Sequence, residues 1–149
     1  MNTFRAFLIL IIGLAVFSVF VFQASAQQLA STGNVIVEDT GSTNFSGYRI
    51  AIEPSGQVNV MGNGKEKRNL VYSYGQYNVS PETVKQLIND LEAVMPLSGV
   101  TPVFCMKSVS FGTITRIIYK GQTSPDIQCM KNAQFVKDVY VIMGKIPRK

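Results

Sequence analysis

The chain has 149 residues, 15% of them charged, and an excess of basic over acidic side chains that gives a net charge of +5. It contains no histidine, so the commonest general base and the commonest metal ligand are both missing. The basic residues gather only near residues 65–68 and 145–149. Nucleic-acid binding calls for a dense basic surface with interleaved aromatic residues, so we expect no nucleic-acid partner.

The first residues have the three parts of a secretory signal peptide. Arg5 is the one charged residue, a run of 17 residues without charge extends from Ala6 to Phe22, and Ala24-Ser25-Ala26 follows. This order predicts a signal peptide over residues 1–26 with cleavage after Ala26, and export to the periplasm or the medium. The alternative is an uncleaved anchor, since a membrane span needs about 20 apolar residues. Contact with a membrane is expected only through such an anchor.

Cleavage would leave 123 residues with 13 basic and 9 acidic side chains, a net charge of +4. This length is sufficient for one domain with a hydrophobic core. Residues 27–46 are rich in Ser, Thr, Gly and Asn, which predicts a flexible N-terminal segment in which Val35-Ile36-Val37 could form an edge strand. The domain proper is expected over residues 47–149.

A hairpin is predicted over residues 47–61. Tyr48, Ile50 and Ile52 alternate with more polar residues, and a period of two is typical of a half-buried strand. Pro54-Ser55-Gly56 supplies turn residues, and the alternation resumes at Val58 and Val60. Residues 62–69 contain no apolar side chain and predict an exposed loop, after which a third strand is expected near residues 70–74.

Two helices are predicted. The first has Ser80 as N-cap and Pro81 at the first helical position, and it should end at Pro96. The second covers about residues 132–143, with Gly144 as its C-cap. Each has apolar residues at helical spacing, which predicts a face packed on a core: Val84, Leu87, Ile88, Leu91 and Val94 in the first helix, and Phe135, Val136, Val139, Tyr140 and Met143 in the second.

Between the helices, β-branched and aromatic residues cluster from residue 109 to Tyr119, which predicts a strand with Gly112 as a bulge or a close-packing point. Lys120-Gly121 fits a tight turn. Residues 123–128 have two interpretations. They form a short edge strand limited by Pro125, or Ser124-Pro125-Asp126 caps a further helix.

The two cysteines, Cys105 and Cys129, predict one disulfide, because an exported protein folds in an oxidising compartment. A structural bridge is favoured over reactive thiols or a metal pair, since histidine is absent and the spacing is not that of a metal knuckle. The complete pattern predicts an α+β fold: a single domain with a mainly antiparallel sheet, two helices packed on one face, and one disulfide.

No residue pattern predicts catalysis, a cofactor or a metal site. The sequence shows no nucleophile with a base and no phosphate-binding glycine motif. Among the carboxylates, Asp126 stands out because it lies near Cys129 in the Ser124-Pro125-Asp126 turn. Its ordinary role would be to cap nearby backbone N–H groups, and the alternative is a functional or recognition carboxylate.

The run Ser108-Val109-Ser110-Phe111-Gly112-Thr113, followed by Tyr119 to Asp126 and then Cys129, resembles a segment of small exported bacterial domains of unknown function. These domains carry a signal peptide, an S-F-G-T strand, a Y-x-G-x-x-S-P-D turn and two flanking cysteines. The resemblance implies a bacterial envelope or secreted protein and adds no catalytic residue.

The leading functional hypothesis is therefore a small exported module that binds an envelope or extracellular protein or ligand, in the manner of an inhibitor. A small hydrolase that uses Asp126 or another carboxylate, and a structural envelope component, are the alternatives.

Overall fold

The computed structural model describes residues 33–63, 70–108, 112–130 and 132–149. These residues belong to one compact unit that extends from Gly33 to Lys149. The predicted signal peptide over residues 1–26 lies outside the described residues. The same holds for residues 64–69 of the predicted loop and for residues 109–111 of the predicted strand.

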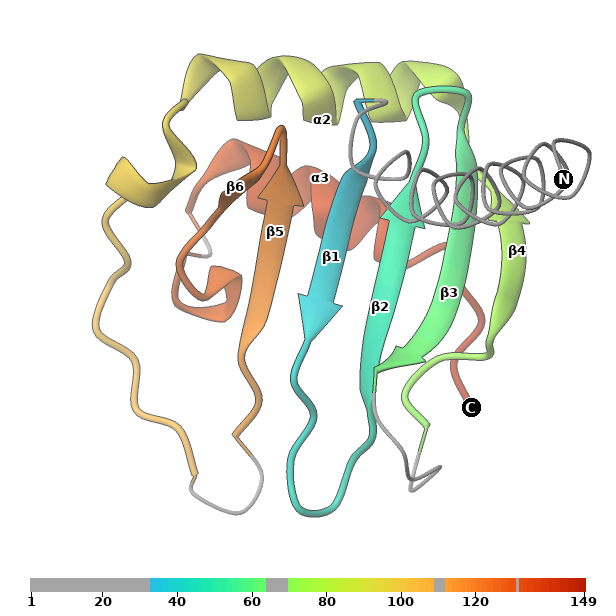
Figure 1. Cartoon of the computed structure of the whole chain (residues 1–149), viewed down its shortest axis with the longest axis vertical. Helices are drawn as coiled ribbons and strands as arrows, with labels where there is room; N and C mark the ends of the chain where they lie inside the picture. The colour runs from blue at the N-terminus through green and yellow to red at the C-terminus, as the bar shows by residue number, and fades with distance from the viewer. Residues whose placement is uncertain (1–32, 64–69, 109–111, 131) are drawn as a thin grey trace, which may run out of the picture. The chain divides into compact units, whose positions relative to one another are not determined.

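In the described part of the chain, six strands form one antiparallel sheet with the order β4-β3-β2-β1-β5-β6 (Figure 1). Their bounds are β1 Val35–Asp39, β2 Gly47–Ile52, β3 Gln57–Asn63, β4 Gly75–Asn78, β5 Thr115–Tyr119 and β6 Gln122–Thr123. The helices are α2 Pro81–Ala93 and α3 Gln134–Met143, with short 3₁₀ turns η1 Leu97–Gly99 and η2 Ile127–Cys129. The predicted α+β fold with a single domain and one disulfide is confirmed.

The expectation of a flexible segment with an edge strand before residue 47 is wrong for residues 35–39. Strand β1 lies in the middle of the sheet, paired with β2 on one side and β5 on the other. Val35 and Val37 have no exposed surface. The sequence of this short segment does not show which strands will lie beside it, because a strand's position in a sheet depends on pairing with distant residues.

The predicted hairpin is confirmed as β2 and β3, joined through Pro54-Ser55-Gly56, with Ile52 opposite Val58 in the register. The third strand was expected near residues 70–74, and this placement is wrong. Strand β4 begins at Gly75, whereas Tyr72 forms only an isolated bridge with Arg148 near the C-terminus. Buried Tyr72 packs edge-on against Tyr48 with ring centroids 5.0 Å apart, so its burial reflects aromatic packing rather than strand pairing.

Helix α2 begins at Pro81, as predicted, and ends at Ala93, before Pro96. The side chain of Ser80 donates to the Glu82 carboxylate and makes no hydrogen bond to the helix backbone. Helix α3 has Gly144 at its C-cap, as predicted. Both helices pack on one face of the sheet (Figure 1), where they bury most of the predicted apolar stripes. Val94 and Tyr140 are the exceptions, with exposed side chains.

The core lies between the helices and the inner face of the sheet. Its fully buried side chains include Ile50 and Ile52 from the sheet, Leu87 and Leu91 from α2, and Phe135 from α3. Among the described residues, no helix is long and apolar enough to cross a membrane.

Candidate functional site

The Ser124-Pro125-Asp126 turn covers the free edge of β5. Strand β6 pairs with only the last two residues of β5, at Ile118 and Tyr119. Beyond it, Ser124 Oγ accepts a hydrogen bond from the Ile117 N–H at 2.9 Å, and the Ser124 N–H donates to the Ile117 carbonyl at 2.8 Å. Asp126 Oδ1 accepts from the Thr115 N–H at 3.3 Å. The turn therefore replaces the missing length of β6 with side-chain acceptors.

Both interpretations of residues 123–128 hold in part. The edge strand exists but stops at Thr123, and Asp126 is the N-cap of the short turn η2. Its Oδ1 atom accepts from the Gln128 N–H at 3.1 Å. Its Oδ2 atom forms an ion pair with the Lys107 ammonium group, and both side chains are largely shielded from water. The expected capping role of Asp126 is confirmed, and both of its oxygens are engaged in structural contacts.

A buried polar chain connects η2 to the middle of the sheet. The Gln128 amide donates to the Thr115 hydroxyl at 2.7 Å, and that hydroxyl donates to Asp39 Oδ2 at 2.6 Å. Asp39 Oδ1 accepts from the Gly41 N–H at 2.8 Å. Burial, and then the nearby Asp39 carboxylate, raise the pKa of Tyr48, so its hydroxyl stays neutral. These hydrogen bonds hold η2 against the sheet.

Against η2 lies an extended segment, residues 101–108, that we call the strap. The Val103 N–H donates to the Cys129 carbonyl at 2.9 Å. Cys105 forms the predicted disulfide with Cys129, with Cα atoms 5.5 Å apart. Lys107 binds Asp126 and the Thr113 carbonyl. Three alternate residues of the strap are therefore attached to the domain.

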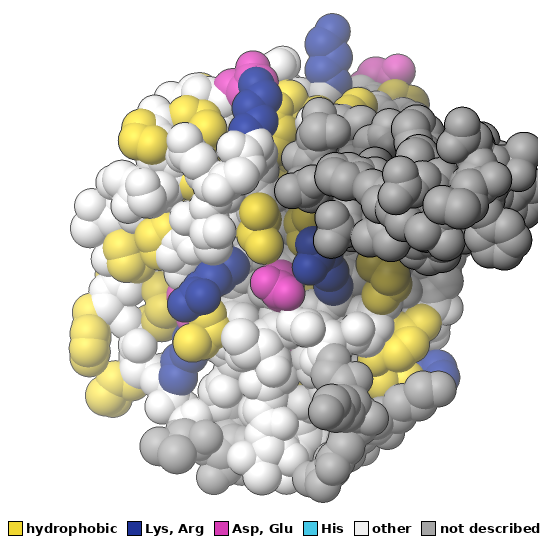
Figure 2. All heavy atoms as spheres, viewed as in Figure 1, with side chains coloured by type: hydrophobic (Ala, Val, Ile, Leu, Met, Phe, Trp, Pro, Cys, Tyr) yellow, Lys and Arg dark blue, Asp and Glu magenta, His cyan; other side chains and the backbone are white. Residues whose placement is uncertain are grey.

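The residues between these attachments point away from the domain. The exposed fraction is 87% for Phe104 and 88% for Met106. Val103 is attached only through its backbone N–H, and its side chain is also exposed, at 66%. Hydrophobic side chains lie along the left edge of the molecule in Figure 2, the side on which the strap runs in Figure 1. Large apolar side chains held this far into water are typical of a surface that contacts another molecule.

Sequence reasoning missed these residues. Four residues of the strap have the composition of a buried strand: Val103-Phe104-Cys105-Met106. Their residue types do not distinguish an exposed segment from a strand in the core. The one available signal was the position of this stretch beside a predicted disulfide. A disulfide holds the backbone in place by itself, so the side chains next to it do not have to be buried in the core.

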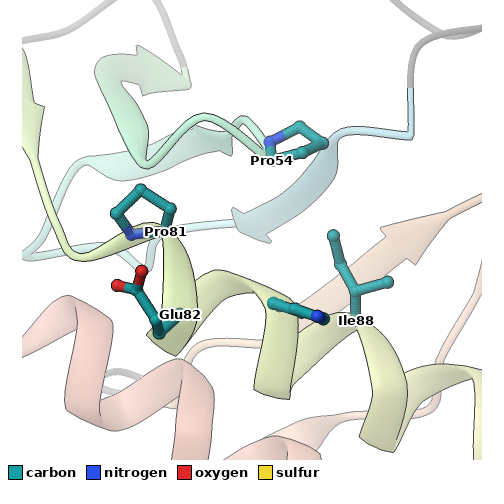
Figure 3. Close-up of a pocket in the computed structure, with 5 residues that line it drawn as sticks. Pro54, Pro81, Glu82 and Ile88 are labelled. Atoms are coloured by element: carbon teal, nitrogen blue, oxygen red, sulfur yellow. The ribbon is translucent and has the colours of Figure 1, made fainter.

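A second feature is a shallow groove of about 380 Å³ between the β2–β3 turn and the start of α2. Its walls are Pro54 on the turn and Pro81, Glu82, Lys85 and Ile88 on the helix, as Figure 3 shows for the labelled residues. The lining is mainly apolar, and Glu82 and Lys85 bring opposite charges to it. Asp126 and the strap do not contribute to this groove.

Two carboxyl groups meet where α2 contacts α3. On each helix a glutamine amide donates to an aspartate four residues later: Gln86 to Asp90 at 2.9 Å and Gln134 to Asp138 at 3.0 Å. Within the described residues, Oδ2 of Asp138 is buried without a hydrogen-bond donor. Burial, and then the neighbouring Asp90 carboxyl, raise the pKa of Asp138. This arrangement favours the protonated form of Asp138.

Among the described residues, no group of three or more acidic or cysteine side chains converges as metal ligands do. No protein-family model matches the chain, and no curated protein is similar to it. The functional proposal therefore rests on the geometry of this chain.

Proposed function

We propose that the mature protein is an exported, non-catalytic binding module that contacts a partner protein through the strap. The carrying observation is the alternation along the strap. Cys105 and Lys107 are fastened to the domain, whereas Phe104 and Met106 project almost fully into water. The domain thus presents two large apolar side chains on a backbone that it holds in place.

The energetics favour such a role. Burial of one large apolar side chain in a partner stabilises a complex by about 1.5–3 kcal/mol. A segment that is already held in position loses less conformational entropy on binding than a free loop does. Phe104 and Met106 therefore combine large apolar area with a low ordering cost.

Export is part of the proposal. The signal-like start of the sequence, Ala6 to Ala26, and the disulfide between Cys105 and Cys129 both fit an oxidising compartment outside the cytoplasm. The disulfide is also the covalent attachment of the strap, so the binding surface depends in part on that compartment.

The hydrolase alternative receives no support from the surroundings of Asp126. Its carboxylate accepts two backbone N–H groups and pairs with Lys107, contacts that maintain the fold. A structural envelope role would need self-association, which the binding experiment below also detects.

Site-specific cross-linking tests the proposal. A photoreactive phenylalanine analogue at position 104 or 106 should give a discrete adduct with a protein of the exported fraction. The same analogue at position 141 is the matched control, because Val141 is an exposed apolar residue on α3 with 53% exposure. Adducts that form equally from positions 104 and 141, or from neither, would refute the proposal. Adducts with a second copy of the chain would favour the structural alternative.

A further inference from the structure

We infer that the partner of the strap is a serine endopeptidase with a deep apolar primary specificity pocket, and that the domain inhibits it by placing Phe104 in that pocket. This inference rests on the proposed function of the strap as the contact element. It goes further by naming the class of partner, the residue that selects it and the consequence for the partner.

The backbone of the strap has the shape that a substrate cleft accepts. Residues 101–108 run without a turn or a bend, and among the described non-glycine residues only Lys120 has a positive φ. Extended peptides bind by main-chain pairing, and side chains that alternate along the chain enter pockets on one side. Phe104 and Met106 are two positions apart and are both outside the domain, so one side of the strap can face such a cleft.

The strap is attached to the domain through the side chains of Cys105 and Lys107 and through the backbone N–H of Val103. An apolar patch for a flat partner surface would need neither the extended backbone nor these attachments. A cleft that reads a peptide needs the backbone free on one side and fixed in its extended form. The strap meets both conditions.

The chain on both sides of the peptide bond between Phe104 and Cys105 is attached to the same residue, Cys129. Val103 donates its N–H to the Cys129 carbonyl at 2.9 Å, and Cys105 is covalently joined to Cys129. Hydrolysis of this bond would take up one water and leave a carboxylate on Phe104 and an ammonium group on Cys105. Both new ends would stay attached to Cys129, so the product would leave the cleft slowly and the bond could re-form by loss of that water.

Phe104 is the residue that determines specificity in this arrangement. A hydrophobic primary pocket accepts a large aromatic side chain, whereas a pocket with an aspartate at its base selects a basic one. Met106 would occupy a second subsite, two residues further along. Lys107, the charged residue of the strap, is already paired with Asp126 and so is not offered to the pocket.

The test is a specificity exchange. The protein from residue 27 to 149, with its disulfide formed, is titrated against one serine endopeptidase with an apolar pocket and one with an acidic pocket, each assayed with a small chromogenic substrate. The wild-type protein should inhibit only the first enzyme. Phe104→Ser should weaken that inhibition by at least about 30-fold, as expected for a central binding residue. Phe104→Lys should transfer inhibition to the enzyme with the acidic pocket.

Val141→Lys is the matched control, because it adds the same charge at an exposed apolar position on α3. It should leave the wild-type inhibition pattern unchanged. Lys107→Ala keeps the disulfide and loosens the strap, so it should weaken inhibition and speed cleavage between Phe104 and Cys105.

Three results would overturn the inference: no inhibition of the apolar-pocket enzyme by the wild-type protein, no transfer by Phe104→Lys, or rapid cleavage of the strap with the enzyme left active. A discrete cross-link from position 104 to a protein that is not an endopeptidase would overturn this inference and leave the proposed function intact. Absence of both the cross-link and the inhibition would overturn both.

Discussion

Ser124 Oγ accepts the backbone N–H of Ile117 at 2.9 Å, in the place that the carbonyl of a neighbouring strand would take. Ser124 is almost fully buried, and its own N–H returns a bond to the Ile117 carbonyl. Exposed edge strands invite pairing with other chains, and proteins protect them with short strands or covering loops. The Ser124-Pro125-Asp126 turn is such a cover, and it also supports η2 behind the strap.

Ser124→Ala should lower the free energy of unfolding by about 1–3 kcal/mol, because it leaves the buried Ile117 N–H without its acceptor. Urea unfolding measures the change. Ser55→Ala on the exposed β2–β3 turn is the control and should change stability little. Equal effects of the two substitutions would show that the edge is not protected by Ser124.

Asp126→Ala should destabilise the domain by about 2–4 kcal/mol, since it removes a partly buried ion pair and the acceptor for two backbone N–H groups. Lys107→Ala should cost less, because the carboxylate keeps its backbone donors. A double-mutant cycle isolates the coupling between the two side chains. Additive losses would indicate that Lys107 and Asp126 do not interact in solution.

Replacement of both cysteines by serine should lower the free energy of unfolding by about 3 kcal/mol, the entropy expected for a closed loop of this length. Amide hydrogen exchange should show a second effect, faster exchange at Val103, because its bond to Cys129 loses the adjacent covalent link. Unchanged exchange at Val103 would contradict the role of the disulfide in holding the strap.

Asp138 should make stability depend on pH. Its pKa is raised by burial and by Asp90, so the folded state holds a proton more tightly than the unfolded state does. This contribution is fully present at pH values below the unfolded pKa of about 3.9 and is lost as pH rises through the raised folded value.

Asp138→Asn keeps a neutral side chain at every pH, so its stability relative to the wild type should increase from pH 4 to pH 7. Chemical unfolding at both pH values measures this difference. Glu53→Gln, on the β2–β3 turn, serves as the control for loss of one carboxyl group elsewhere. A constant difference between Asp138→Asn and the wild type would contradict the raised pKa of Asp138.

Two glycines with positive φ provide a matched pair. Gly121 has a φ of 73° and open space around it, so Gly121→Ala should cost only the backbone preference of about 1–2 kcal/mol. Gly56 has a φ of 91°, and an added Cβ would lie 2.3 Å from the Val79 carbonyl oxygen. Gly56→Ala should cost more than Gly121→Ala in thermal unfolding, because the backbone at Val79, between β4 and α2, must also shift. The reverse order would contradict the observed turn.

Local patterns in the sequence were sufficient for the β2–β3 hairpin, the start of α2 at Pro81 and the C-cap at Gly144. Each depends on residues close together in the chain, through side-chain periodicity or through the fixed φ of proline. The disulfide also followed from the sequence, because the signal-like N-terminus predicts an oxidising compartment and two cysteines have one pairing available. The capping role of Asp126 followed from the same local chemistry.

Tertiary structure decided the rest. Strand β1 became central through pairing with β2 and β5, and Tyr72 was buried by its contact with Tyr48 rather than by a strand. Neither contact has a local signature. The clearest case is the strap, where Phe104 and Met106 have the composition of a core and lie in water. Their exposure depends on the attachments of the strap to Cys129 and Asp126, which lie 24 and 19 residues further along the chain than Cys105 and Lys107. The local periodicity of side chains contains no information on contacts at this separation.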